Sequence, residues 1–328
     1  MIPQAETATG ERSPGSRLDL SYILPVRSTR PERDLDTYLA EIGLRVEVIV
    51  VDGSPKGVFD QNHRRWAELI DHHVPVDPER ETTNGKVGGV LTGLRLASHE
   101  ALVIADDDVR WTSELLQRAM TEIASVDVVR PQNWFAPSPW HARWDTARSL
   151  VNRAVSGDWP GTLVVRRSAL LRTGGYDGDV LFENLELVRT IRASGGRERV
   201  ARDLLVPRLP PSLRQFLRQR MREAYDEFAR PGRLLVELSL LPAALLGRKR
   251  AIAVLGAGSV ALAEVGRRRG AGRTVFPPTA ALWAPAWLAE RSVTSWLALA
   301  SRIFLGGVRY RGRVLRRAAH SKRTLRRS

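Results

Sequence analysis

The stretch ALVIADDDVRW, residues 101–111, sets five apolar residues directly before three adjacent carboxylates. A short, continuous apolar run of this kind predicts a strand that is covered on both faces of a sheet. Asp106, Asp107 and Asp108 repel one another, so a positive group is expected beside them. The stretch therefore predicts a buried strand that delivers carboxylates to a binding site at its end.

The neighbouring segments extend the same pattern. Further apolar strands are predicted at 18–26, 46–51 and 161–166, and apolar residues follow helical spacing at 31–42, 61–70, 86–97 and 113–124. This alternation predicts an α/β fold, with a mainly parallel sheet covered by helices on both faces. Ligands bind beyond the carboxyl ends of strands in such sheets, so Asp52 is expected to share one crevice with the three carboxylates.

The second half of this region is less regular. Further helices are predicted to begin near residue 182 and to span 213–230. Before them lies a loop, 130–144, that is rich in aromatic residues. Its side chains offer stacking surfaces for a ligand and equally suit an ordinary core. They are Trp134, Trp140, His141 and Trp144.

The composition excludes several kinds of site. The 328 residues contain no cysteine, so disulfides and thiolate metal sites are impossible. The net charge of +15 is confined to one part of the chain, because residues 231–328 carry +16 and residues 1–230 carry −1. The basic clusters alternate with runs of Leu, Ala and Val. This pattern favours an anionic membrane surface as partner and disfavours nucleic acid.

The C-terminal part predicts helices that associate with a membrane. Two apolar runs, 234–246 and 251–265, are each shorter than the ~20 residues of an upright span, and each contains a glutamate. A transmembrane hairpin that barely crosses the bilayer and a pair of interfacial helices both fit this pattern. The segment 280–308 carries Trp283, Trp287 and Trp296, which is typical of a membrane-interface helix. Residues 309–328 contain no acid and are expected to lie against anionic headgroups.

The carboxylate triplet itself has three explanations. A single aspartate is enough to cap a helix, and a solvated turn is a second possibility. A site for a divalent cation explains why the acids stand together, because Mg²⁺ and Mn²⁺ prefer hard oxygen ligands. Such ions commonly arrive with substrate phosphates, which makes a nucleotide diphosphate the natural partner.

Five segments of the chain resemble family 2 glycosyltransferases in their order and spacing. They are LSYILPVRS (20–28), VEVIVVDGSP (46–55), NGKVGGVLTGLRLASHEALVIADDDV (84–109), GGYDGDVLFENLELVRTIRASGG (174–196) and QRMRE (219–223). The resemblance covers roughly residues 18–230 and implies a GT-A fold, a nucleotide-binding α/β sandwich. The hydrophobic C-terminal part is similar to that of membrane-associated members that glycosylate lipids, of the ceramide and hopanoid type.

The resemblance also implies which residues contact the donor. Asp52 would contact the uracil or ribose, and Lys86 would lie near the base or diphosphate. Asp108 would bind Mg²⁺ or Mn²⁺ directly, with Asp106 as the other half of the D-x-D pair. Without the resemblance, Asp52 is a common turn residue and Lys86 a common residue at a helix start. The donor-contacting residues implied are Pro25, Val26, Arg27, Asp52, Lys86, Asp106, Asp107 and Gln219.

The catalytic base departs from the family pattern. The family carries Glu-Asp where this chain has Glu183-Asn184, and an amide cannot take a proton from an acceptor hydroxyl. Glu183 or Glu186 is expected to serve instead, because residues i and i+3 share one helical face. Two further acids, Asp177 and Asp179, are close in sequence to Glu183.

The last motif departs as well. Gln219 and Arg222 match the Q-x-x-R part, which implies that Arg222 helps to hold the leaving diphosphate. Glu223 replaces the tryptophan that comes next in the family. An aromatic contact to the acceptor is therefore expected from Tyr225 or Trp159.

These observations predict a membrane-associated glycosyltransferase. It would move a sugar from a nucleotide-sugar, UDP-linked, to a lipid or cell-envelope acceptor, with a divalent cation and with inversion. Two alternatives stay open. One is a catalytically degenerate scaffold that binds nucleotide-sugar or lipid, which Asn184 and Glu223 favour. The other is a nucleotidyltransferase, whose glycine- and arginine-rich loop is poorly matched by PVRSTRPERD (25–34).

The predicted organisation has four parts. A disordered leader spans 1–17, the GT-A domain 18–230, the membrane-associated helical region 231–310 and the basic tail 311–328. The expected location is a bacterial cell membrane with the catalytic domain facing the cytoplasm, as the positive-inside rule prefers.

Overall fold

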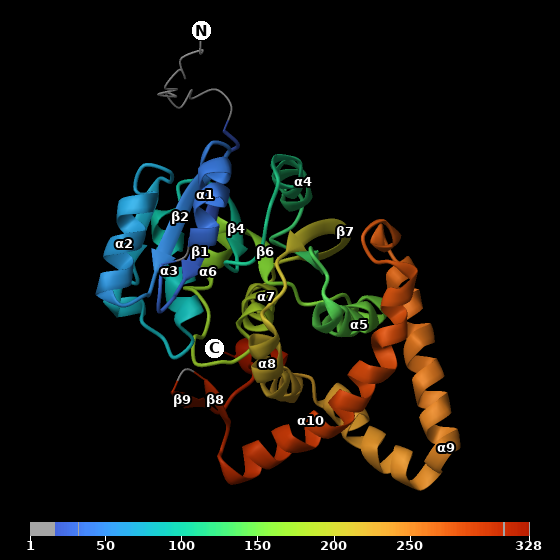
Figure 1. The fold of residues 1–328 in the computed structure, drawn as a ribbon. Coiled ribbons are helices and arrows are strands. Elements are labelled where there is room, and N and C mark those ends of the chain that lie inside the picture. Colours follow the sequence, from blue (N-terminus) through green and yellow to red (C-terminus); the bar gives the residue numbers. More distant parts are fainter. Residues whose placement is uncertain (1–16, 32, 311, 328) are drawn as a thin grey trace.

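A seven-stranded sheet forms the centre of the computed structural model, which describes residues 17–31, 33–310 and 312–327 (Figure 1). The strands lie in the order β3-β2-β1-β4-β6-β5-β7, and β6 runs antiparallel to its neighbours β4 and β5. The other pairs are parallel. The mainly parallel α/β sheet expected from the sequence is confirmed. The strands are β1 (Leu20–Val26), β2 (Glu47–Asp52), β3 (His72–Pro75), β4 (Ala101–Ala105), β5 (Val128–Phe135), β6 (Thr162–Arg166) and β7 (Glu198–Arg208).

Helices cover both faces of this sheet. The apolar residues of β1, β2 and β4 alternate between two cores, since successive side chains of a strand point to opposite faces. One core joins the sheet to α1, α2 and α4, and the other joins it to α3, α6 and α7. The helices of this part are α1 (Asp36–Gly43), α2 (Lys56–Trp66), α3 (Gly85–Leu96), α4 (Ser113–Ile123), α5 (Trp140–Val155), α6 (Arg167–Arg172), α7 (Glu183–Ala193) and α8 (Leu213–Tyr225).

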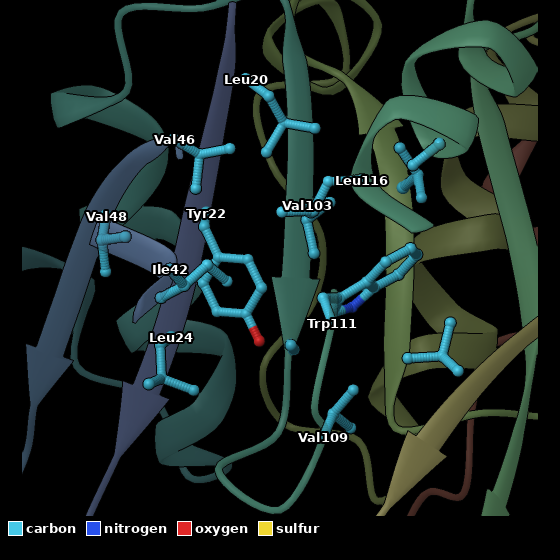
Figure 2. Close-up of a cluster of buried hydrophobic side chains, with 14 of the residues drawn as sticks. Leu20, Tyr22, Leu24, Ile42, Val46, Val48, Val103, Val109, Trp111 and Leu116 are labelled. Atoms are coloured by element: carbon cyan, nitrogen blue, oxygen red, sulfur yellow. The ribbon is translucent and has the colours of Figure 1, made fainter. Parts of the chain in front are cut away.

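The turn that carries the carboxylates is anchored in the first of these cores. Figure 2 shows Val109 and Trp111 in the same apolar cluster as Tyr22 and Val103. Val109 is fully buried, and the indole N–H of Trp111 donates to the hydroxyl of Thr162 over 3.1 Å. Val109 and Trp111 come immediately after the carboxylates in the chain, so the core fixes the turn on its downstream side.

Several element boundaries differ from the sequence-based expectation. The helix expected at 61–70 spans 56–66, and the expected loop 130–144 is divided between β5 and α5. β3 and β7 were not expected at all. β7 has the sequence ERVARDLLVPR, in which charged residues interrupt the apolar pattern, and the part-buried positions alternate only loosely. The predicted leader, 1–17, lies outside the described residues except for Arg17, which pairs with Asp71.

The C-terminal helices pack against the α/β part of the chain. α9 (Pro231–Arg268) bends at Arg248, where φ is 48°, and α10 (Ala284–Phe304) returns beside it (Figure 1). Both contact α5, and α10 also contacts α8. Trp287 is 3% exposed in a cluster with Trp134 and Trp144, so its assignment to a membrane interface was wrong. The same cluster supports the interpretation of the aromatic segment 130–144 as ordinary core.

A small hairpin after α10 returns to the α/β part of the chain. β8 (Val308–Tyr310) pairs with β9 (Arg313–Leu315), and α11 (Lys322–Leu325) follows. Leu315 and Ala318 are buried in one cluster with residues of α7 and α8. The main chain at Arg317 and Ala318 accepts hydrogen bonds from the segment that leads into α7. The described residues of the predicted basic tail, 312–327, therefore begin in a packed hairpin.

No helix among the described residues has the length and hydropathy needed to cross a membrane. The expectation of a transmembrane helix is therefore not supported. The two apolar runs of the sequence correspond to the two halves of α9, on either side of its bend.

Candidate active site

Two protein cations lie beside the carboxylates that follow β4. Lys86 Nζ is 2.6 Å from Asp106 Oδ1, and Arg208 Nε is 2.8 Å from Asp108 Oδ2. Arg208 Nη2 also lies 3.4 Å from Asp106 Oδ2. Lys86 comes from the first turn of α3 and Arg208 from the last residue of β7. The positive partner expected from the sequence is built into the fold, from two elements that are distant in the chain.

These groups shift one another's pKa. Burial opposes the charged form of Lys86, but Asp106 and Glu183 outweigh it and raise the pKa of the ammonium. Burial likewise opposes the charged form of Asp106, yet Lys86 and Arg208 hold the pKa of its carboxyl below the ordinary value. Burial raises the pKa of Asp108, and the charge of Asp106 adds to this effect against the opposing charge of Arg208. The charge of Asp106 is thus better compensated than that of Asp108.

Asp108 is the residue that fits a divalent cation. Its Oδ1 is buried and has no hydrogen-bond partner among the described residues, whereas its Oδ2 and both oxygens of Asp106 lie beside Lys86 or Arg208. The described part of the chain contains no group of three His, Cys, Asp or Glu side chains that could hold a metal ion. One or two carboxylates are the usual protein share for Mg²⁺ that is bound together with substrate phosphates. The predicted cation is compatible with this arrangement, and Asp108 is its available ligand.

Gly161 allows the loop before β6 to approach the carboxylates. Its carbonyl accepts a hydrogen bond from the N–H of Asp106 over 2.8 Å, and its own N–H donates to Oδ1 of Asn133 over 2.8 Å. A Cβ at this position would overlap Oδ2 of Asp106. The absence of a side chain at Gly161 is therefore a requirement of the site.

The carboxyl ends of β1 and β2 lie side by side, at the same edge of the sheet as the carboxyl end of β4. The parallel register pairs Val26 with Asp52. Pro25 is half-buried, Val26 is buried and Arg27 is exposed just beyond the strand. The structure thus brings these three residues to the edge where the carboxylates lie, and their contact with a nucleoside stays a prediction.

Asp52 is engaged by protein groups. It is 1% exposed, and its carboxylate accepts hydrogen bonds from Ser54 N–H over 2.8 Å and from Asn62 Nδ2 over 2.9 Å. His73 Nε2 lies 3.4 Å away. Burial disfavours the charge, yet these hydrogen bonds hold the pKa of Asp52 below its ordinary value. Direct contact with a nucleoside requires one of the bonds to break, and the bond to Ser54 is the turn interaction that the sequence also allowed.

Glu183 joins the cluster from the first turn of α7. Lys86 Nζ lies 2.8 Å from Glu183 Oε1 and donates to Asn184 Oδ1 over 3.5 Å. The Nδ2 of Asn184 donates to the carbonyl of Pro160 over 2.8 Å. Asn184 therefore links α7 to the loop before β6, and Glu183 is the carboxylate of this turn that faces the Lys86–Asp106 pair.

The match to a family model decides the class of the protein. Residues 33–170 match the model of glycosyl transferase family 2. The chain carries a family 2 glycosyltransferase domain. It is an enzyme of the glycosyltransferase class, as the five segments of the sequence predicted. No curated protein matches the chain significantly.

Three solved structures are similar to this glycosyltransferase to different extents. A mannosyltransferase from Pyrobaculum calidifontis, in complex with GDP-Man and Mn²⁺, is 19% identical over 91% of each chain, with a TM-score of 0.53. Glucosyl-3-phosphoglycerate synthase from Mycobacterium tuberculosis is 18% identical over 62% of this chain and 75% of that chain, with a TM-score of 0.41. Mannosyl-3-phosphoglycerate synthase from Rubrobacter xylanophilus is 14% identical over 62% and 70%, with a TM-score of 0.42. The first likeness shows the GT-A fold and nothing of the substrates.

Glu186 is separated from the carboxylate cluster of the glycosyltransferase. Its side chain is fully buried, and its carboxylate accepts hydrogen bonds from the main-chain N–H of His320 over 2.7 Å and from the ring Nδ1 over 2.8 Å. Asp177 lies 3.5 Å from the same ring nitrogen. The prediction that Glu186 serves as a base is not supported, because the C-terminal segment occupies both of its oxygens.

Arg222 lies beside the site, at the end of α8. Its charge lowers the pKa of Asp106, although burial, Lys86 and Arg208 act more strongly on that carboxyl. The guanidinium stacks on the ring of Tyr310 at 4.8 Å, and its buried Nε has no hydrogen-bond partner among the described residues. Gln219 is half-buried one turn earlier on the same helix. Arg222 is thus placed where it can meet a negative charge next to Asp106.

Glu223 has a structural explanation in this glycosyltransferase. Its carboxylate lies 2.8 Å from Arg220, 3.5 Å from Arg148 and 3.6 Å from Arg291 of α10. Burial nevertheless raises the pKa of Glu223 above its ordinary value. The residue that replaces the family's tryptophan therefore joins the catalytic part to the C-terminal helices.

The aromatic residues expected at an acceptor site are mostly engaged elsewhere. Tyr225 is fully buried, and its hydroxyl donates to the carbonyl of Arg316 over 2.9 Å. Trp159 packs against Phe182 and lies under the guanidinium of Arg130 at 3.9 Å. The ring Nε2 of His141 contacts the carbonyl of Pro211 at 2.8 Å. Trp140 stays 48% exposed, so its ring is still open to an acceptor.

Two residues near the site were missed by sequence analysis. Arg208 was missed because β7 was missed, although an arginine that ends an apolar stretch before LPP was a usable signal. Asp226 comes after α8, and its buried Oδ1 has no hydrogen-bond partner among the described residues. Burial raises the pKa of Asp226 well above the ordinary value, with Glu183 and Glu223 adding to the effect and Arg222 opposing it. Nothing in the sequence distinguished Asp226 from the other acidic residues of the chain.

Proposed function

We propose that the enzyme transfers a sugar from a nucleotide-sugar, UDP-linked, to a lipid or cell-envelope acceptor, with Mg²⁺ or Mn²⁺ and with inversion. The observation that carries the proposal is the Lys86–Asp106–Asp108–Arg208 cluster at the carboxyl ends of β4 and β7. Ligands of open α/β sheets bind at this edge. A second carboxylate, Glu183, lies within reach of the same lysine.

The residues of the cluster have separate tasks in this proposal. Asp108 would hold the cation, which neutralises charge on the diphosphate as it departs. Lys86 and Arg208 favour the charged form of Asp106, and Arg208 also orients Asp108. Arg222 is placed to stabilise negative charge that develops on the leaving group. Glu183 is the group proposed to take the proton of the acceptor hydroxyl, and its bond to Lys86 orients the carboxylate for this step.

The test of donor binding is a titration of the purified chain with UDP by calorimetry, with and without Mn²⁺. We expect binding that depends on Mn²⁺ and is lost in Asp108→Ala. Asp19→Ala is the matched control, since Asp19 is exposed at the opposite end of β1. No UDP binding by folded wild-type protein contradicts the UDP-linked donor, and GDP and dTDP are then the donors to test. Binding without turnover would instead favour the scaffold alternative.

The membrane surface and cytoplasmic-facing location belong to the same proposal. Their support is a band of exposed apolar side chains in the C-terminal helices, with Arg248, Lys249 and Arg250 at the bend of α9. The bend and the end of α10 lie on the same lower side of the molecule in Figure 1. Such a mixture suits a helix pair that lies in the interface of an anionic bilayer. The most exposed apolar residues of this band are Leu235, Leu245, Leu246, Val254, Ile303 and Phe304.

Flotation with liposomes tests this part separately. We expect the chain to float with vesicles that contain phosphatidylglycerol, and less so as salt increases. Leu246 is 85% exposed and Phe304 is 82% exposed. Replacing both by glutamine is expected to reduce the fraction of protein that floats with the vesicles. Leu217→Gln is the control, because Leu217 is 60% exposed on α8. Equal flotation of all variants would contradict the assigned surface.

A further inference from the structure

A second cavity lies between the C-terminal hairpin and the segments that lead into α3 and α7. Its volume is about 550 Å³, which is in the range of small-molecule sites. One wall is formed by Thr83 and Asp179, and another by Phe228 and Leu315. Three arginines, Arg302, Arg316 and Arg317, complete the lining. Neither the family match nor the donor site described above accounts for this cavity.

The charge of the lining is positive. Asp179 is the one acid among the cavity residues of the described chain, and three arginines line the same cavity. Asp179 Oδ1 accepts a hydrogen bond from Thr83 N–H over 3.3 Å. The nearest carboxylate to Arg317 is that of Asp177, at 3.7 Å. The positive charge of the three arginines therefore exceeds the negative charge of the one acid in the lining.

The arginines differ in how firmly they are held. Arg302 Nη1 donates to the hydroxyl of Tyr225 over 3.1 Å, and the guanidinium stacks on Phe228 at 5.2 Å. Arg316 is fixed through its main chain, because its carbonyl accepts from both Tyr225 and Arg302. The side chain of Arg316 has no ion pair or hydrogen bond with any residue in the described ranges. A guanidinium that lacks a partner in the protein and stands on a fixed backbone is suited to bind an anion.

The cavity borders the catalytic cluster. Thr83 precedes Asn84, whose side chain caps α3 just before Lys86. The hydroxyl of Tyr310, in β8, lies 3.4 Å from Oδ1 of Asn84. Asp179 likewise lies four residues before Glu183, the proposed base. A molecule held in the cavity would thus extend from the C-terminal hairpin towards the beginning of α3 and α7.

We propose that this cavity binds a phosphate group of the acceptor, held by Arg302, Arg316 and Arg317. The inference rests on the proposed function and deepens it, since it gives the acceptor a chemical class. A phosphate carries the double negative charge and the oxygen geometry that paired guanidinium groups bind best. Apolar contacts from Phe228 and Leu315, and the exposed Ile303 and Phe304 at the end of α10, favour a phosphate that belongs to a lipid.

The experiment measures binding of a short-chain phosphatidic acid, below its micelle concentration, to the full chain by calorimetry without nucleotide. Dihexanoyl phosphatidylcholine and inorganic phosphate are the comparison probes. We expect phosphatidic acid to bind, and Arg316→Gln with Arg317→Gln to weaken it at least about tenfold through loss of charge-assisted hydrogen bonds. Arg313→Gln is the matched control, because Arg313 is exposed on the same hairpin and does not line the cavity.

The outcomes separate the possible sources of the phosphate. Tenfold weaker binding in the double variant, with inorganic phosphate much weaker than the lipid, supports a lipid phosphate. Equal affinity for inorganic phosphate, lost in the same variant, supports the phosphate site and assigns it to a soluble acceptor. Equal weakening by Arg313→Gln, or no binding of any phosphate by folded protein, overturns the inference. UDP binding measured on the same preparations shows whether the donor site itself has failed.

Discussion

At the scale of single residues, the site is a set of carboxylates whose charges are unequally compensated. Asp106 has Lys86 and Arg208 beside it, whereas one oxygen of Asp108 has no partner among the described residues. Asp226 is a third case, a half-buried acid near Glu183 with a raised pKa. The positive groups beside each acid decide its chemistry. A carboxylate oxygen without a hydrogen-bond donor from the protein is stabilised most by binding a proton or a cation.

The first prediction concerns Arg208. In Arg208→Ala we expect the free energy of unfolding to fall by about 1–3 kcal/mol, because Asp106 and Asp108 lose their shared counterion. Mn²⁺ is expected to restore part of the lost stability, because its positive charge would lie beside the same two carboxylates. Urea denaturation with and without Mn²⁺ measures both effects. A variant as stable as the wild type without the ion would contradict the role of Arg208.

The second prediction concerns Asp226 and pH. Its folded-state pKa is raised well above 3.8, so the stability that the neutral acid contributes is present below that value and is lost as the pH rises through the raised pKa. Asp226→Asn removes this loss. We expect the free energy of unfolding of the variant to exceed that of the wild type at pH 8 and to match it near pH 4 and below. Unfolding curves across this pH range check the sign, and equal stabilities at pH 8 would refute it.

At the scale of elements, close helix packing explains how the C-terminal part is attached. α9 crosses α5 so closely that a Cβ at Gly266 would overlap the carbonyl oxygen of Leu150. Nearby, Arg153 is fully buried and its Nε donates to the carbonyl of Gly266 over 3.1 Å. The apolar run that the sequence assigned to a membrane is thus, at this end, a helix–helix interface.

The third prediction compares two glycines of α9. Gly266→Ala is expected to reduce stability by about 1–3 kcal/mol, because the added methyl must push α9 away from α5. Gly256→Ala is the matched control, since a Cβ there meets no atom within 4 Å. Alanine is the better helix former, so the control is expected to gain about 0.5–1 kcal/mol. Thermal unfolding of both variants measures the difference, and equal effects would mean that the close approach is unimportant.

At the scale of the whole molecule, the chain end closes back onto the catalytic part. Glu223 is paired with Arg291, and Glu186 with His320, so polar contacts join the C-terminal region to α8 and α7 at two points. The hairpin that carries Tyr310 lies between these connections. The region therefore forms part of the wall of the site, in addition to the membrane contact that we propose for it.

The fourth prediction tests this closure. His320→Ala leaves the fully buried carboxylate of Glu186 without its ring partner, so we expect a loss of about 2–4 kcal/mol in the free energy of unfolding. The control is Lys322→Ala, since Lys322 is exposed two residues later. Hydrogen exchange at Leu181 and Phe182, whose N–H groups donate to the C-terminal segment, is expected to accelerate in the first variant alone. Unchanged exchange would contradict the docking of the chain end.

Local sequence patterns were enough to predict β1, β2, β4 and β6 and the edge of the sheet that carries the site. Continuous apolar strands and their spacing predicted the α/β fold, and chain order alone put Asp106 and Asp108 at the carboxyl edge. These features are local, since they depend on periodicity and on the residues directly after each strand. Lys86 and Glu183 were named from the motifs, and the structure brings both to that edge.

The charges that meet in the site were decided by the tertiary fold. Arg208 reaches Asp108 across 100 positions of the chain, and His320 reaches Glu186 across 134, which removes Glu186 from the cluster although it lies one turn from Glu183. The fold also buries Trp287 and packs α9 on α5. An ion pair or a helix contact between distant segments produces no periodic pattern in the sequence of either segment. Its free energy arises from burial and geometry, which exist once the chain has folded.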